Sequence, residues 1–256
     1  MSLLLAIDVG NTHITVGAFQ NRTLAHTWRL QTHPHDTADE LGIQFSDLLH
    51  YAALDAHDVT GVAIASVVPS LDSALEKASS LYLRQVPVVV KPGVKLGVAN
   101  LYRNPQEVGA DRLVNAVAVH ALVKGPAIVV DFGTATTFDC VSARGEYLGG
   151  SIAPGLELAN EALAHRTAKL PQVTFQVPSR ALGKTTVESL QSGLFWGYVG
   201  LVEGILSKLC REMKGKPVVV ATGGLSPVIG PRISAVRRIE PSLTLEGLRL
   251  IWERNR

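Results

Sequence analysis

The chain begins with an apolar run that ends in an acidic residue and a glycine turn. From Leu4 to Gly17 the sequence is LLAIDVGNTHITVG, in which the aliphatic run reaches Asp8 and the chain turns at Gly10. A buried run, a glycine turn and a second β-rich run predict two antiparallel strands joined by a tight turn. The segment 24–30 continues this hairpin, which predicts a β-meander at the start of the fold.

The same pattern recurs half a chain later. From Ala127 to Val141 the sequence is AIVVDFGTATTFDCV, and its apolar run ends at Asp131. Two short strands with glycine turns can arise by chance in an α/β protein. Both copies, however, place a carboxylate at the end of an apolar strand, where burial costs free energy unless a cation or hydrogen-bond donors face it. The shared acid favours an internal duplication.

Segments with helical and strand periodicity alternate along the rest of the chain, which favours an α/β architecture. Predicted helices cover 36–49, 71–83, 108–122, 155–164 and 186–211, and further predicted strands cover 61–67, 87–90, 147–152 and 217–221. The length of 256 residues falls between the expectations for one domain and for two.

Both hairpin turns carry groups that suit a polyphosphate. Glycine lets the backbone approach a ligand closely, and the N–H groups of such turns, with neighbouring Asn and Thr side chains, can donate to phosphate oxygens. Asp8 and Asp131 would repel phosphate but can hold cations, since Mg²⁺ often uses one or two carboxylates together with phosphates. Two such turns facing each other would hold a polyphosphate from both sides.

A third glycine turn, ATGGLS at 221–226, follows the apolar run PVVVA. Without side chains at Gly223 and Gly224 the strand end can approach a flat ring, which suits a nucleoside. Each of these three turns is by itself compatible with an ordinary turn, but together they indicate a nucleotide site. The sequence contains neither GxxxxGK[ST] nor GxGxxG after a strand, which disfavours P-loop and dinucleotide-binding folds.

A further segment, VGADR at 108–112, precedes an otherwise apolar helix. In one interpretation Asp111 complements the dipole at the start of a helix and Arg112 forms a surface ion pair. In the other, Asp111 accepts the proton of a substrate hydroxyl and Arg112 orients Asp111 or the substrate, because phosphoryl transfer needs a positioned acceptor. The residues alone leave both open.

Composition excludes several classes of function. The chain is 46% hydrophobic and 18% charged, with a formal net charge of +2, which is typical of a globular protein and too weakly basic for nucleic-acid binding. The arginines near the C-terminus are predicted to lie on a solvated surface: Arg232, Arg237, Arg238, Arg249, Arg254 and Arg256.

No further motif in the sequence predicts a metal site, a membrane span or a secretory signal. Cys140 and Cys210 lack metal-ligand spacing and are expected as free thiols in a reducing compartment. The run THPHD at 32–36 has two histidines, but its proline predicts a surface turn. Without a basic signal region or a long apolar run, we expect a cytoplasmic protein that does not contact membranes.

In their order along the chain, DVGNT, YRNPQEVGADR, DFGTATT, GGSIAPG and ATGG resemble the motifs of type III pantothenate kinases, from Leu4 to about Leu225. The resemblance implies a duplicated, two-lobed α/β fold of the actin-like ATPase (ribonuclease H-like) class, with mixed sheets and flanking helices. We accordingly predict an N-terminal lobe over 1–120 with the first phosphate turn and the acceptor-binding segment. A C-terminal lobe over 121–256 would hold the second phosphate turn and the nucleoside-binding turn.

The resemblance also implies an activity, which is transfer of the ATP γ-phosphoryl group to the primary hydroxyl of pantothenate. The product would be 4′-phosphopantothenate, in the first step of coenzyme A biosynthesis. The implied cofactors are ATP, Mg²⁺ near Asp8 and a monovalent cation, K⁺ or NH₄⁺, on Asp131. A homodimer is implied, with the long helix near 189–209 as its candidate contact.

The same resemblance implies a role for each matching residue. Asp111 would be the catalytic proton acceptor. The ATP site would comprise Asp8, Val9, Gly10, Asn11, Thr12, His13, Ile14, Thr15 and Thr134. The pantothenate site would comprise Tyr102, Gly109, Ala110, Asp111, Arg112 and Thr186.

Two alternatives remain. One is a kinase of the same superfamily that acts on another small hydroxylated metabolite, against which the VGADR segment argues. The other is a nucleotide-binding regulatory protein, which would tolerate the loss of Asp111.

Overall fold

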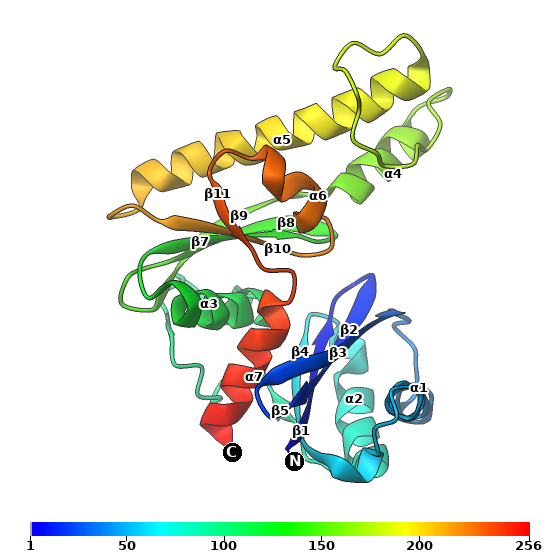
Figure 1. Cartoon of the computed structure of the whole chain (residues 1–256), viewed down its shortest axis with the longest axis vertical. Helices are drawn as coiled ribbons and strands as arrows, with labels where there is room; N and C mark the ends of the chain where they lie inside the picture. Colours follow the sequence, from blue (N-terminus) through cyan, green and yellow to red (C-terminus); the bar gives the residue numbers. More distant parts are fainter. Residues whose placement is uncertain (1) are drawn as a thin grey trace. The chain divides into compact units, whose positions relative to one another are not determined.

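The computed structural model describes residues 2–256 (Figure 1). The chain divides into two compact units, of which the first runs to Ala121 and includes Leu243–Arg256, and the second is Leu122–Ser242. The chain therefore passes from the first unit to the second directly after Ala121, beside the predicted boundary at residue 120. The C-terminal segment, which we expected in the second lobe, packs in the first unit.

The first unit is built on a mixed five-stranded sheet with the strand order β3-β2-β1-β4-β5. The strands β1 (Leu3–Val9), β2 (His13–Gln20) and β3 (Thr23–Gln31) form an antiparallel meander. On the other side of β1, β4 (Val59–Ser66) and β5 (Val88–Val89) run parallel to it. The predicted hairpin and its extension into a meander are confirmed.

Alternation along β1 sends its side chains into two cores, because successive residues of a strand face opposite sides of the sheet. Leu5 and Ile7 pack against α1 (Ala38–Tyr51) and α2 (Pro69–Tyr82). Leu4 packs on the opposite face with residues of the two remaining helices. Asp8 is next in the series of Leu4, so its carboxylate belongs to that opposite face.

The two helices on that opposite face are α3 (Ala110–Val123) and α7 (Leu243–Asn255). They approach closely, because a Cβ added to Gly247 of α7 would lie 2.6 Å from Cγ1 of Val114 in α3. The contact fixes α3, whose first turn carries Asp111. Sequence analysis predicted α3 and missed α7. The short elements of this unit are η1 (Ala56–Asp58), β6 (Ala99–Asn100) and η2 (Pro105–Glu107).

The second unit repeats the strand pattern of the first. Five consecutive strands have the order β11-β10-β7-β8-β9. The strands β7 (Ala127–Phe132), β8 (Ala135–Val141) and β9 (Glu146–Pro154) are antiparallel, whereas β10 (Val218–Thr222) and β11 (Val236–Ile239) run parallel to β7. β7 thus corresponds to β1 and β10 to β4, which supports the internal duplication.

One face of this second sheet packs against the long helix α5 (Thr186–Glu212), which runs across the sheet in Figure 1. Thr185 caps the helix by accepting a hydrogen bond from the Glu188 N–H at 3.2 Å. The other helical elements are α4 (Leu156–Arg166), α6 (Ser226–Ile229) and η3 (Gly230–Arg232). No helix within residues 2–256 has the length and apolarity that a bilayer span requires.

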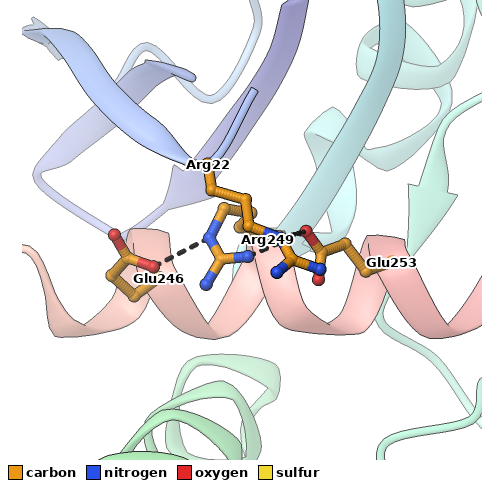
Figure 2. Close-up of polar contacts among 4 residues, drawn as sticks. All are labelled: Arg22, Glu246, Arg249 and Glu253. Carbon is orange, nitrogen blue, oxygen red and sulfur yellow. Dashed lines mark hydrogen bonds and ion pairs between the residues drawn. The ribbon is translucent and has the colours of Figure 1, made fainter. Parts of the chain in front are cut away.

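Figure 2 shows how ion pairs join α7 to the β2–β3 turn. Arg249 Nε donates to Glu246 at 2.9 Å and Arg249 Nη1 donates to Glu253 at 2.9 Å. The Arg249 side chain is 12% exposed, and its guanidinium carbon lies 5.9 Å from the centre of the Phe19 ring. The prediction of a solvated surface was wrong for Arg249. Its guanidinium packs over the Phe19 ring and is paired with two carboxylates, which allows it to be largely buried.

We expect Arg249→Ala to lower the free energy of unfolding by about 2 kcal/mol, because it removes a partly buried side chain and takes a cationic partner from each of two carboxylates, Glu246 and Glu253. The matched control is Arg22→Ala. Arg22 donates to the same Glu253 at 3.2 Å but is 77% exposed, so its loss should cost at most about 0.5 kcal/mol. Urea unfolding of both variants measures the difference, and equal losses would contradict a structural role for Arg249.

Candidate active site

The first phosphate turn, which joins β1 to β2, is held by hydrogen bonds on both sides. The Gly10 N–H donates to the His13 carbonyl at 2.9 Å. From the end of β3, Thr32 donates its hydroxyl to the Gly10 carbonyl at 2.7 Å and its N–H to the Thr12 carbonyl at 2.9 Å. Thr32 is 7% exposed, so the prediction of a surface turn at 32–36 was wrong for its first residue.

Polar side chains extend from Asp8 across the meander. Asp8 pairs in register with Thr15, and Thr15 pairs with Arg29 of β3, so the three share one face of the sheet. Arg29 Nη2 lies 2.8 Å from His13 Nδ1. Because a guanidinium can only donate, His13 Nδ1 is the acceptor and its proton resides on Nε2. His13 can therefore present an N–H group beside the turn.

Asp111 lies in the first turn of α3 and is half-buried. Its Oδ1 accepts a hydrogen bond from the Arg112 N–H at 2.8 Å. Burial raises the pKa of Asp111, although this hydrogen bond and the charge of Arg112 act in the opposite direction. A carboxylate with a raised pKa accepts a proton more readily. The charge of the buried Arg112, which is 7% exposed, favours the ionised form of the Asp111 carboxylate.

The start of α3 lies near the ends of β1 and β4. A Cβ added to Gly109 would lie 2.5 Å from Asp111 Oδ1 and 3.5 Å from Cγ1 of Val67. Val67 follows β4 and donates its N–H to the Val9 carbonyl at 3.0 Å. The first unit therefore brings the first phosphate turn and the VGADR segment to the same end of its sheet. Their proximity could not be inferred from the sequence, in which the two segments lie far apart.

Tyr102 belongs to the ordered loop that leads into α3. Its N–H donates to Asn100 Oδ1 at 3.0 Å, and Asn100 Nδ2 donates to the Pro105 carbonyl at 3.2 Å. Asn104 Nδ2 donates to Glu107 Oε1 at 2.8 Å. These bonds fix the loop, so the half-buried Tyr102 has a defined position relative to the VGADR segment.

In the second unit the three glycine-rich motifs converge on Asp131. The Gly155 N–H donates to the Thr134 carbonyl at 3.1 Å, and a Cβ on Gly155 would lie 2.5 Å from the Gly133 carbonyl oxygen and closer still to that of Thr134. Gly223 has a φ of +87°, and a Cβ there would lie 2.5 Å from Asp131 Oδ1. The motifs at 131–137, 149–155 and 221–226 thus form one site.

Within the second unit, Tyr198 of α5 contacts Thr136 of the 131–137 motif. Tyr198 is 5% exposed, and its hydroxyl is hydrogen-bonded to the hydroxyl of Thr136. Burial and the charge of Asp131 raise the pKa of Tyr198 to about 12, so the phenol stays protonated. Thr186 is the exposed first residue of α5, directly after the Thr185 cap. Tyr198 is therefore a core residue of the second unit.

The residues present fit the implied cations. Within residues 2–256, no three His, Cys, Asp or Glu side chains lie together in a way that could hold a metal ion. Mg²⁺ bound mainly through substrate phosphates needs only one or two protein carboxylates, and Asp8 beside the first turn meets that need. Asp131, packed against the backbone of Gly223, offers the oxygen ligands that hard cations prefer.

A model of the type III pantothenate kinase family matches residues 4–208 of the chain. The type III pantothenate kinase of Moorella thermoacetica is 52% identical over 253 residues, which cover 99% of this chain and 100% of that protein. This chain belongs to the type III pantothenate kinase family. Membership extends over both units, so both phosphate turns and the VGADR segment lie in the shared region.

Solved structures of other kinases share the fold of this family member. A putative 2-dehydro-3-deoxygalactonokinase from Sinorhizobium meliloti has a TM-score of 0.63 at 13% identity, covering 98% of this chain and 96% of its own. A ROK family glucokinase from Streptomyces griseus has a TM-score of 0.57 at 13% identity, covering 98% and 99%. The prediction of an actin-like α/β fold is confirmed.

The structure adds site residues that the sequence did not reveal. Arg29 and Thr32 reach the first turn from β3 and its end. Tyr198 of α5 is hydrogen-bonded to Thr136 and is influenced by the charge of Asp131. The usable signal for Arg29 was the predicted meander, since pairing the strands in register places it opposite Thr15. No pattern in the sequence points to Tyr198, because its contact depends on how α5 packs on the sheet.

We expect Gly155→Ala to weaken ATP binding at least about 10-fold, because the added methyl must displace the backbone of the second turn. Gly125→Ala is the control in the same unit, since a Cβ there would meet nothing nearer than 3.9 Å. Calorimetric titration with ATP measures both. Unchanged affinity in Gly155→Ala would show that the turn at 133–134 does not contact the nucleotide.

Proposed function

We propose that this chain transfers the γ-phosphoryl group of ATP to the primary hydroxyl of pantothenate, giving 4′-phosphopantothenate for coenzyme A biosynthesis. The observation that carries the proposal is the placement of Asp111. It is a half-buried carboxylate with a raised pKa, at the same end of the first sheet as the turn of Asp8. Membership of the type III pantothenate kinase family supplies the acceptor.

The first turn has the groups to bind phosphate. Asp8–Thr15 combines backbone N–H groups, the Asn11 and Thr12 side chains and the Nε2–H of His13, all of which can donate to phosphate oxygens. Thr134 contributes from the second turn. Asp8 would hold Mg²⁺ directly or through water, and the ion would supply charge neutralisation for the transferred phosphoryl group. Because phosphoryl transfer depends mainly on positioning and charge, rigid turns suit it.

Asp111 is the proton acceptor for the pantothenate hydroxyl. A general base works best when its pKa lies near the working pH, and burial moves the pKa of Asp111 in that direction. Arg112 keeps Asp111 oriented through its N–H, and its hydrogen bond and charge lower the pKa of Asp111 against the larger effect of burial. Tyr102, Gly109 and Ala110 complete the acceptor site of the first unit. Thr186 would be a further pantothenate-binding residue.

Asp131 holds a monovalent cation, K⁺ or NH₄⁺. Such a cation offsets the negative charge that Asp131 would otherwise present to the nucleotide. The tight packing of Gly223 on Asp131 Oδ1 supports this role, because it fixes the carboxylate where any larger residue would displace it.

The enzyme acts as a homodimer through α5. One side of the helix carries Gly193, Gly197, Gly200 and Gly204, and a Cβ added to any of them would meet nothing within 4 Å. Trp196, which is 41% exposed, lies beside them on the helix. An apolar face with small residues lets a second helix approach closely. The cytoplasmic location stays a prediction.

In the presence of ATP, Mg²⁺ and K⁺, we expect ADP release that depends on pantothenate. A coupled ADP assay, with mass spectrometry of the phosphorylated product, measures it. Sugars and other small alcohols serve as competing acceptors. Faster turnover with one of them would favour the alternative kinase, whereas ATP binding without turnover on any acceptor would favour the regulatory protein.

We expect Asp111→Asn to lower kcat by about 10²–10⁴-fold while leaving ATP affinity unchanged. It should not lower the unfolding temperature at neutral pH. Since the pKa is raised in the folded state, stability associated with this carboxyl is present below its ordinary pKa of 3.8 and is lost as pH rises through the raised value. The Asn amide does not ionise, so Asp111→Asn avoids the stability that the parent enzyme loses at neutral pH.

The control for this variant is Glu107→Gln, which neutralises an exposed carboxylate in the same segment. Steady-state kinetics and thermal unfolding at pH 7 compare the two. A kcat of Asp111→Asn equal to that of the parent enzyme would remove Asp111 from the proton transfer, and a large drop in unfolding temperature would make its effect structural.

A further inference from the structure

Thr222, the last residue of β10, has a hydroxyl whose burial its surroundings do not explain. The residue is 1% exposed, and its Oγ1 has no hydrogen-bond partner among residues 2–256. A buried hydroxyl without a partner costs free energy, and such groups are uncommon in native proteins. Thr222 therefore holds a polar atom where an apolar one would be more stable, unless a ligand satisfies it.

The register of the second sheet places this hydroxyl beside the Asp131 carboxylate. Thr222 and Asp131 are paired residues of the parallel strands β10 and β7, so their side chains leave the same face of the sheet. Ala221 and Val219 of β10 belong to the core on the opposite face. Gly223, the next residue, packs directly on Asp131 Oδ1.

The first unit shows that the fold itself does not need a hydroxyl here. In the matching topology, the partner of Asp8 on the neighbouring parallel strand is Ala65 of β4, which is 0% exposed. An apolar residue thus fills the corresponding position next to the other strand-end carboxylate. The hydroxyl at Thr222 is a specific feature of the Asp131 site.

We propose that Thr222 Oγ1 is a ligand, together with Asp131, of the monovalent cation, an inference that rests on the proposed function. A hydroxyl oxygen beside a carboxylate oxygen presents two lone-pair donors to one site, which suits a hard cation. An anionic phosphate at the same place would be repelled by Asp131. The neutral hydroxyl adds an oxygen ligand without adding charge, which suits an ion of charge +1.

The test compares three substitutions by thermal unfolding without nucleotide or pantothenate, in KCl and in tetramethylammonium chloride. A cation that binds only the folded state stabilises it by RT ln(1 + c/Kd), where c is the K⁺ concentration, so the rise of the unfolding temperature with K⁺ concentration reports the Kd. Thr222→Val has nearly the shape of threonine and lacks the hydroxyl. Thr222→Ser keeps the hydroxyl, and Thr222→Ala copies Ala65, so that one informative variant remains if the valine does not fold.

We expect the parent protein and Thr222→Ser to be stabilised by K⁺ with a similar Kd, taken from the dependence of the unfolding temperature on K⁺ concentration. Thr222→Val and Thr222→Ala should need at least about 10-fold more K⁺. In tetramethylammonium chloride, Thr222→Val should be at least as stable as the parent, because it removes a buried group without a partner.

Two outcomes would overturn the inference. One is a parent protein that K⁺ does not stabilise. The other is a Thr222→Val variant that is destabilised in tetramethylammonium chloride yet keeps the parent's K⁺ response, as a hydroxyl bonded to a buried water would give. The unfolding measurement does not depend on turnover. If K⁺ stabilised the protein through Thr222 but no pantothenate-dependent ADP release occurred, the proposed function would be wrong and the cation site would still be supported.

Discussion

A carboxylate at the end of a buried strand is the constraint on which the rest of this structure depends. Asp8 ends the buried series of β1, and Asp131 ends that of β7. Each strand is central to its sheet, with an antiparallel neighbour on one side and a parallel neighbour on the other. A charge in that position is costly unless its surroundings supply donors or cations, so the turns that follow must be rich in glycine and hydroxyl groups.

The two units share this constraint and meet it with different chemistry. In the first, the sheet end beside Asp8 also receives the start of α3, which brings a second carboxylate, Asp111, with a raised pKa. In the second, the corresponding sheet end is closed by Gly155 and Gly223, which pack on the turn and on Asp131. The duplicated scaffold thus places a carboxylate with a raised pKa at one sheet end and a rigidly packed carboxylate at the other.

The sequence predicted the features that depend on local pattern. The hairpins after Asp8 and Asp131, the helix that begins at Ala110 and the long helix from Thr186 follow from apolar periodicity and glycine turns, and the structure has them. Features that depend on register or on packing of distant segments escaped. Arg29 reaches His13 only because β3 pairs with β2 in one register, and Arg249 is partly buried only because α7 returns to the first unit.

Thr222 illustrates why polar residues in strands resist prediction. In the sequence it ends an apolar run before two glycines, as any turn-proximal threonine might, and β-propensity alone would account for it. Its significance arises from pairing with Asp131 and from comparison with Ala65 at the equivalent place in the first unit. The duplication therefore gives the chain an internal control, because a position that one copy fills with a methyl group and the other with a buried hydroxyl reports a functional demand rather than a folding one.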